Sequence, residues 1–256
     1  MFKKMTVLGA LCVAAFASMS ANAAEVSISK LRVNLENGQT ADFLTVRNES
    51  DTQKEAFEIS LKRWTEKSNL DTYAADSKVT DHTPQEVLED TDDILASPKT
   101  MVIEPQKEKI VRIIVNNADN AAKNYSYRLI INQLPNHELD APKNTVNLLF
   151  KISLPVFVYK DPIKTIDKIA VPYTFSDENH KHYITFKNND TQHIQIQDID
   201  YKTGKNSINN YVLPGVEDKI QLPDDFNQQD LTKNPLTIVT DKGNLVIGGS
   251  KDDAKK

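Results

Sequence analysis

Residues 144–159 read NTVNLLFKISLPVFVY, and apolar side chains occupy every second position along most of this stretch. Such alternation is typical of a β-strand with one buried face. Sixteen extended residues would span roughly 50 Å, whereas an ordinary strand has about 5 to 6 residues. Pro155 lacks an amide donor, so the strand must bend, bulge or lie at a sheet edge there. The stretch therefore predicts a long apolar edge with which another polypeptide pairs.

The first 23 residues have the composition of an export signal. Lys3 and Lys4 precede an apolar run from Val7 to Ala17, and small residues suited to cleavage follow at 21–23. The run is too short to cross the roughly 30 Å hydrocarbon core. We therefore interpret residues 1–23 as a signal peptide and expect no membrane insertion after its removal. Cys12 is the single cysteine of the chain, so the remainder has no disulfide and no thiolate metal site.

Charge and composition narrow the class of the exported part. Without the signal, 29 basic residues stand against 36 acidic ones, a net charge of −7, which argues against a nucleic-acid partner. About 233 residues are enough for one large or two ordinary domains. Short alternating runs separated by Asn, Asp, Gly and Pro predict an all-β chain of the sandwich type. The break at 160–162 favours two domains, at 24–160 and 163–248, with a disordered tail at 249–256.

Apolar alternation predicts the individual strands. In the first domain they are expected at 26–35, 41–48, 55–64, 100–103, 109–115 and 125–133, followed by the long one. Between residues 65 and 98 the composition is polar and acidic, so we expect a solvated loop with a short helix around 85–88. A weaker second set is expected at 166–171, 182–187, 193–201, 219–222, 236–240 and 245–247. No internal repeat is strong enough to align.

Four of these segments, taken together, resemble the periplasmic chaperones of chaperone-usher pilus assembly. They are VSISKLRVNL at 26–35, IEPQKEKIVRI at 103–113, YRLIINQLP at 127–135, and the long strand before the break. They occur in the family's order and at about its spacing. The ISLPVFV wording and the acidic insertion before Ile103 are more similar to the archaic branch than to the classical one.

The resemblance implies two immunoglobulin-like β-sandwich domains in a boomerang arrangement, located in the periplasm, with no enzymatic activity and no cofactor. Such a protein stabilises pilus subunits that lack their last strand, by donor-strand complementation, and delivers them to an outer-membrane usher. The donated side chains would be Val146, Leu148, Phe150, Ile152 and Leu154. In the absence of a subunit, the same strand could support self-association.

The family also holds the subunit's C-terminal carboxylate with basic side chains between the domains. Arg32 matches the arginine of the first strand, and its guanidinium suits a bidentate carboxylate pair. Where the classical pattern has a lysine in the last strand, Ser153 stands here, so Lys151 and Arg112 are the candidates for the second anchor. Gln133 stands where classical members carry an acidic residue that helps to fix the domains, which leaves the usual interdomain ion pair in doubt.

Two other classes of protein compete with this interpretation. His180, His182 and His193 could ligate copper or zinc in a periplasmic metal-binding module, although surface histidines on an edge strand are the simpler interpretation, and we predict no metal site. A secreted adhesin or pilus component would share the β-rich composition but would normally be one domain with its own donor extension. The sequence contains neither a GxSxG elbow nor a phosphate-binding loop, so neither motif indicates catalysis here. We expect Trp64 to be a core residue at a strand end.

Overall fold

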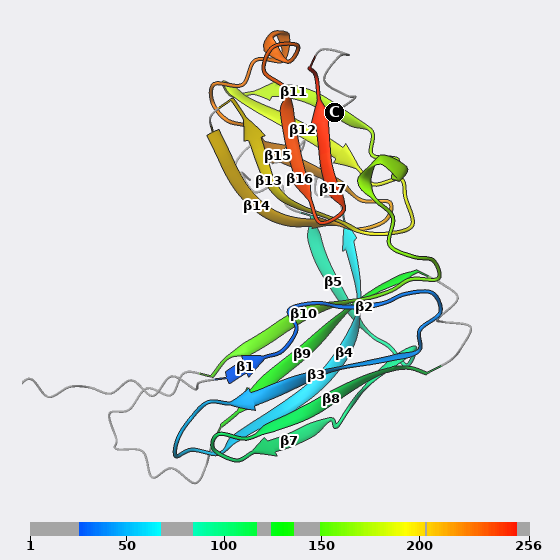
Figure 1. Cartoon of the computed structure of the whole chain (residues 1–256), viewed down its shortest axis with the longest axis vertical. Helices are drawn as coiled ribbons and strands as arrows, with labels where there is room; N and C mark the ends of the chain where they lie inside the picture. The colour runs from blue at the N-terminus through cyan, green and yellow to red at the C-terminus, as the bar shows by residue number, and fades with distance from the viewer. Residues whose placement is uncertain (1–25, 68–83, 117–123, 136–148, 203, 250–256) are drawn as a thin grey trace, which may run out of the picture.

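The computed structural model describes residues 26–67, 84–116, 124–135, 149–202 and 204–249. Its regular structure is almost entirely β, arranged as two sandwiches that meet end to end at an angle (Figure 1). The predicted all-β architecture of two immunoglobulin-like sandwiches is therefore confirmed. The expected signal peptide and residues 250–256 of the expected tail lie outside the described residues. None of the described helices is long and apolar enough to cross a membrane.

The first sandwich consists of two sheets. Sheet A has the order β1-β3-β8-β6, formed by Val26–Ile28, Ala41–Asn48, Glu108–Val115 and Ile94–Ser97. Sheet B has the order β2-β10-β9-β4-β5, formed by Val33–Leu35, Lys151–Val158, Tyr125–Leu134, Glu55–Lys67 and Gln85–Asp90, and β7 (Thr100–Ile103) also pairs with β4. Alternate apolar residues of both sheets fill the space between them, and Leu35, Leu44, Phe57 and Val156 are fully buried there.

The segment expected as one strand at 26–35 is divided between the two sheets. Its first part, β1, pairs antiparallel with β3 in sheet A, and its second part, β2, pairs parallel with β10 in sheet B. The chain crosses from one sheet to the other over residues 29–32. Apolar residues alternate on both sides of the crossing, but they change from even positions (26 and 28) to odd positions (31, 33 and 35). The prediction of a single strand overlooked this change.

Strand β10 pairs along its whole length with β9 but only in part with β2. The register with β9 runs from Lys151 to Val158, whereas β2 meets β10 only at Val156–Val158. Among the described residues, no strand covers the β2-side edge of residues 151–155. The predicted strand at 144–159 is thus observed from Lys151, and residues 144–148 lie outside the described part of the chain.

The expectation of a loop with a short helix at residues 65–98 is wrong for the described residues there. Strand β4 continues to Lys67, and β5 pairs antiparallel with it, with Trp64 opposite Leu88 and Glu66 opposite Glu86. Strand β6 follows and pairs with β8. Of the acidic residues that indicated a loop, Glu89 and Asp90 lie on an exposed edge strand, where they remain solvated while the backbone is paired, and Asp92 and Asp93 lie in the bend that follows it.

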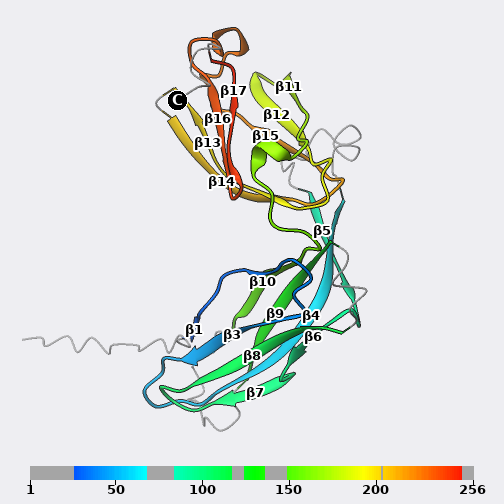
Figure 2. The same ribbon diagram turned by 45° about the vertical axis from the view of Figure 1, so that its right-hand side comes forward.

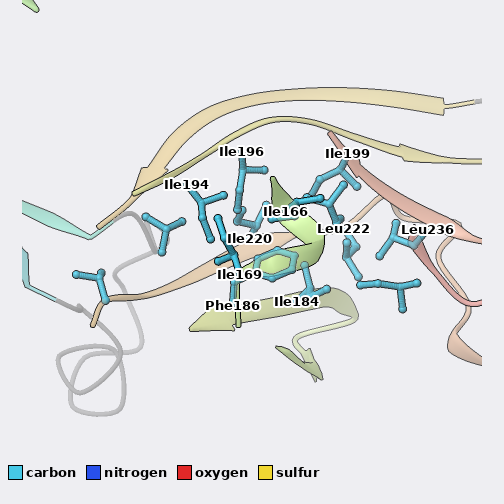
Figure 3. Close-up of a cluster of buried hydrophobic side chains, with 14 of the residues drawn as sticks. Ile166, Ile169, Ile184, Phe186, Ile194, Ile196, Ile199, Ile220, Leu222 and Leu236 are labelled. Carbon is cyan, nitrogen blue, oxygen red and sulfur yellow. The ribbon is translucent and has the colours of Figure 1, made fainter. Parts of the chain in front are cut away.

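The second sandwich also consists of two sheets. Sheet C has the order β11-β12-β15, formed by Tyr173–Glu178, Lys181–Lys187 and Glu217–Gln221. Sheet D has the order β14-β13-β16-β17, formed by Gly204–Val212, Ile194–Tyr201, Leu236–Thr240 and Gly243–Ile247. Isoleucine dominates the core between them, and residues such as Ile184, Ile196 and Ile199 point toward one another from facing strands (Figure 3).

Three expectations for this half need correction. The segment at 166–171 is not a strand but begins with the 3₁₀-helix η1 (Ile166–Lys168), and Ile166 and Ile169 contribute to the core from outside the sheets. Strands β11 and β14 were not predicted. Both are edge strands with mostly exposed side chains, so neither carries the apolar alternation on which the prediction relied.

One short motif occurs at the same structural position in both sandwiches. VRNESDTQ at 46–53 and FKNNDTQ at 186–192 each leave a strand through a fully buried asparagine. The Nδ2 of Asn48 donates to the carbonyls of Gln53 and Ile103, and the Nδ2 of Asn188 donates to those of Gln192 and Val212. Each Oδ1 accepts from the backbone amide two residues later. The two corners satisfy buried backbone groups in the same way, although no long repeat is visible.

Asn48→Ala and Asn188→Ala should each lower the free energy of unfolding by about 1–3 kcal/mol, because each leaves buried backbone groups without their partner. The measurement is urea denaturation followed by circular dichroism. Asn189→Ala is the matched control, since Asn189 is exposed beside Asn188. A loss in the control as large as in Asn188→Ala would contradict the role of the corner.

Candidate functional site: the junction of the two sandwiches

An ion pair joins the two sandwiches. Arg32 lies immediately before β2, and its Nη1 donates to the Oδ2 of Asp241 in the turn between β16 and β17, at 2.7 Å. The Oε1 of Gln195 lies 3.4 Å from the same nitrogen. The side chain of Asp241 is 5% exposed and that of Arg32 is 30% exposed. Arg32 therefore reaches the surface while one of its nitrogens fixes the second sandwich to the first.

Asp241 is the centre of the hydrogen bonds at this junction. Besides Arg32, it accepts from the Nε2 of His193 at 3.1 Å and from the backbone amide of Gln195 at 2.9 Å. Burial alone would raise the pKa of Asp241, but the hydrogen bonds from His193 and Gln195 and the charge of Arg32 outweigh it and lower the pKa. The carboxylate is consequently held ionised between the domains.

His193 is a buried, neutral partner of Asp241. Its ring stacks on Phe157 of β10 at 3.5 Å between ring centroids, and its Nδ1 accepts from the hydroxyl of Tyr159. With Nε2 donating to Asp241 and Nδ1 accepting, the neutral tautomer satisfies both partners. Burial lowers the pKa of His193 to about 4, against the opposing effect of Asp241.

An aromatic cluster forms the other side of the junction. Trp64 of β4 meets Tyr211 of β14 edge-on at 5.4 Å and Phe157 at 5.9 Å between centroids. The guanidinium of Arg128 on β9 lies 3.6 Å above the Trp64 ring and pairs with Glu86 of β5 at 2.6 Å. Trp64 is buried as expected, but it packs with the core of the second sandwich and lies within β4 rather than at its end.

The predicted basic anchors are not brought together. Arg32 lies at the junction, whereas Lys151 is exposed at the start of β10, opposite Asn132. The cross-strand partner of Arg128 is Pro155, four positions after Lys151 in β10. Lys151 and Pro155 are therefore roughly 13 Å apart along the strand. Arg112 is exposed on β8 of the other sheet, opposite Phe43.

The donor-strand positions fall into two groups. Leu154 is 5% exposed in the protein's own core, and Phe150 and Ile152 pack against that core while half-buried. Val146 and Leu148 lie outside the described residues. Leu154 is therefore closed to a partner in this structure.

Sequence reasoning missed Arg128 and Asp241. Arg128 interrupts an otherwise apolar strand, YSYRLII, and such a charge indicates that one face of the strand is not in the core. Asp241 lies in a hairpin turn, where aspartate is common for local reasons, so its sequence context carries no functional signal.

Gln133 does not take part in the junction. It lies on β9 opposite Phe57, and its amide donates to Glu55. Gln133 thus makes no ion pair between the domains, as its replacement of an acidic residue led us to expect, and a different pair, Arg32 with Asp241, joins them.

The three candidate metal-binding histidines are separated. His193 is enclosed at the junction, whereas His182 lies on β12 of sheet C and its Nδ1 is 2.6 Å from Asp177. His180 occupies the turn between β11 and β12 with a φ of 62°. In the described ranges, no three His, Cys, Asp or Glu side chains are grouped so as to hold a metal ion.

Comparison with known proteins shows which family a part of the chain resembles. Residues 65–162 match the family model described as "Pili and flagellar-assembly chaperone, PapD N-terminal domain". This segment of the chain is therefore similar to the N-terminal domain of pilus-assembly chaperones. The matched residues include the end of β4 and all of β9 and β10, with Arg128 and the open edge, but they begin one residue after Trp64. No curated protein sequence matches this chain.

Solved structures share the fold over most of the chain. The CsuC–CsuE chaperone–tip subunit complex of archaic Csu pili of Acinetobacter baumannii matches with a TM-score of 0.61 and 16% identity, covering 89% of this chain and 100% of that one. The complex of the Salmonella enterica SafA pilin with the SafB chaperone gives 0.54 and 14%, covering 88% and 97%. The E. coli chaperone DraB gives 0.54 and 13%, covering 88% and 95%.

The stability of the chaperone should fall as the pH decreases from about 6.5 to 4, because His193 is held neutral in the folded state and takes up a proton on unfolding. The shift in pKa corresponds to about 3 kcal/mol. Asp241, whose pKa is lowered, adds a loss in the same direction at still lower pH.

Urea midpoints at pH 7.0, 5.5 and 4.5 test this. His193→Gln should be less stable than the wild type at pH 7 but should show a flatter pH dependence. His182→Gln, at a partly exposed position, serves as the control and should keep the wild-type slope. An unchanged slope in His193→Gln would assign the pH dependence to other groups.

Proposed function

We propose that this chain is a periplasmic chaperone that captures incomplete pilus subunits by lending them the edge of β10, and that it delivers them to an outer-membrane usher. The observation that carries the proposal is the one-sided pairing of β10 over residues 151–155. An extended segment with free backbone groups on one side is suited to β-strand addition. The export signal at 1–23 supports a periplasmic location.

Apolar burial would supply the binding energy. Val146, Leu148, Phe150 and Ile152 continue the alternation of β10 toward the open end. Each would contribute about 1.5–3 kcal/mol on full burial, or roughly 6–12 kcal/mol before ordering costs. Leu154 is left out because it already lies in the chaperone's own core. When no subunit is bound, the same edge is available to a second copy of the chain.

Structures with the same fold support pilus subunits as the partners. CsuC is complexed with the tip subunit CsuE, and SafB with the pilin SafA. These proteins are distant in sequence, so the identity of the subunits that this chain serves does not follow from them.

Arg32 is proposed as the anchor for the subunit's C-terminal carboxylate, with Arg128 rather than Lys151 or Arg112 as the second cation. The positive charges of Arg32 and Arg128 both act to lower the pKa of Tyr211, so the two guanidinium groups lie near the same side chain at the junction. Arg128 is held by the Trp64 ring and Glu86, so its orientation is fixed before a ligand arrives. Lys151 is too far along β10, and Arg112 belongs to the other sheet.

Delivery to the usher requires a surface that stays free while a subunit occupies β10. The outer face of sheet A meets this requirement, because it exposes Phe43, Leu95, Ile110 and Ile114 around Arg112. Several large apolar side chains on one face are typical of a protein-binding surface. We assign Arg112 to this surface rather than to the carboxylate anchor.

Leu148→Asp should abolish subunit capture without unfolding the chaperone, because the charge would have to enter the apolar groove of the subunit. The measurement is the amount of a co-expressed pilus subunit that co-purifies from periplasmic extracts. Leu149→Asp, of opposite parity in the alternation, is the matched control and should retain most of the subunit. Recovery of the subunit with Leu148→Asp at normal yield would argue against strand donation.

Arg32→Ala should lower the affinity for the subunit by roughly ten- to a hundredfold if Arg32 binds the carboxylate, because a charge-assisted pair is worth about 1.5–3 kcal/mol. Asp241→Asn removes the same interdomain ion pair but keeps the positive charge of Arg32. An anchoring role predicts a loss with Arg32→Ala and with Arg128→Gln, and little loss with Asp241→Asn. Equal losses for Arg32→Ala and Asp241→Asn would reduce Arg32 to a structural link.

A further inference from the structure

The ribbon formed by β4 and β5 extends from the first sandwich to the second (Figures 1 and 2). Glu66, close to the end of β4, makes a contact with the second sandwich there. Its Oε2 accepts a hydrogen bond of 3.2 Å from the backbone amide of Leu213, which follows β14 and is 3% exposed. A carboxyl group therefore forms part of the contact between the ribbon and a buried backbone group.

The surroundings of Glu66 favour its neutral form. Asp218 of β15 is fully buried, and Glu86 of β5 lies opposite Glu66 in the ribbon. Arg128 of β9 is the cation that acts on Glu66, but it is already paired with Glu86. Burial, reinforced by the negative charges of Asp218 and Glu86, outweighs the Leu213 amide and Arg128 and raises the pKa of Glu66 to about 8.

We propose that Glu66 is a proton-dependent latch between the two sandwiches: the protonated carboxyl group holds the ribbon against Leu213, and loss of the proton as the pH rises toward 8 releases it. An ionised carboxylate would accept the Leu213 hydrogen bond more strongly. However, it would have to remain half-buried beside two other acids. Release returns it to water, where its charge is solvated.

The sign of the pH dependence follows from linkage. Released Glu66 has an ordinary pKa near 4.5, whereas docked Glu66 has a pKa of about 8, so the docked state binds the proton more tightly. Docking is most favourable below pH 4.5, and the ratio of docked to released molecules falls by about tenfold per pH unit between these two values. Above about pH 8 the ratio is lowest and constant.

Trp64 is a natural reporter of this contact. It is the single tryptophan of the chain and lies two residues before Glu66 in β4. Its side chain is 2% exposed and packs against Tyr211 of the second sandwich. Titration of wild-type protein from pH 6 to 9.5 should shift the Trp64 emission to longer wavelength, with a midpoint between pH 6 and 8 and a plateau above that range. Small-angle X-ray scattering at pH 6.5 and 9.5 should show an increase in the radius of gyration at the higher pH.

Glu66→Gln should abolish both changes and keep the low-pH emission and dimensions throughout. Glu58→Gln, on the same face of β4 but exposed and distant from the junction, should titrate as the wild type does. Two other groups of the junction, His193 and Tyr211, do not account for a transition in this pH range. The pKa of His193 is about 4, and burial raises the pKa of Tyr211 above its usual value.

Three results would overturn the latch. Constant emission in the wild type from pH 6 to 9.5 is the first, and an equal transition in Glu66→Gln is the second. The third is a shift in emission without any change in scattering, because Glu66 would then ionise in place without releasing the ribbon.

Discussion

The crossing of the chain from sheet A to sheet B at residues 29–32 is the constraint on which the rest of the structure depends. Because it divides one extended segment into two strands of three residues, β2 is too short to cover β10. The same crossing places Arg32 at the end of the first sandwich, where Asp241 of the second sandwich meets it. One change of sheet thus produces both the open edge and the charged junction.

Much of this fold could be predicted from the sequence, and the failures have physical reasons. Strands with one buried face, such as those containing Phe57 and Val156, show period-two alternation and were found. Strands β5, β11 and β14 lie at sheet edges with both faces largely in solvent, so alternation could not reveal them. The crossing at residues 29–32 was missed because the apolar positions alternate on both sides of it, and the change from even to odd positions at Lys30 was not used.

The junction was harder to predict than the sandwiches because its members come from both halves of the chain. Arg32 was identified through its motif, whereas Arg128 and Asp241 depend on partners far away in sequence. Lys151 was chosen because it is near in sequence to Ser153, but the register with β9 places it well away from the junction. The repeated asparagine corner could have been found, since RNESDTQ and KNNDTQ share a short pattern.

Trp64, Phe157 and Tyr159 belong to the polypeptide of the first sandwich, yet they pack in the apolar cluster of the second. The boundary in sequence and the boundary of the core therefore do not coincide. A fragment beginning after residue 160 would present an uncovered apolar end, and the excised first half would expose three aromatic rings. We infer that the two halves melt as one cooperative unit, so that strain applied to either half is transmitted to the other through shared packing.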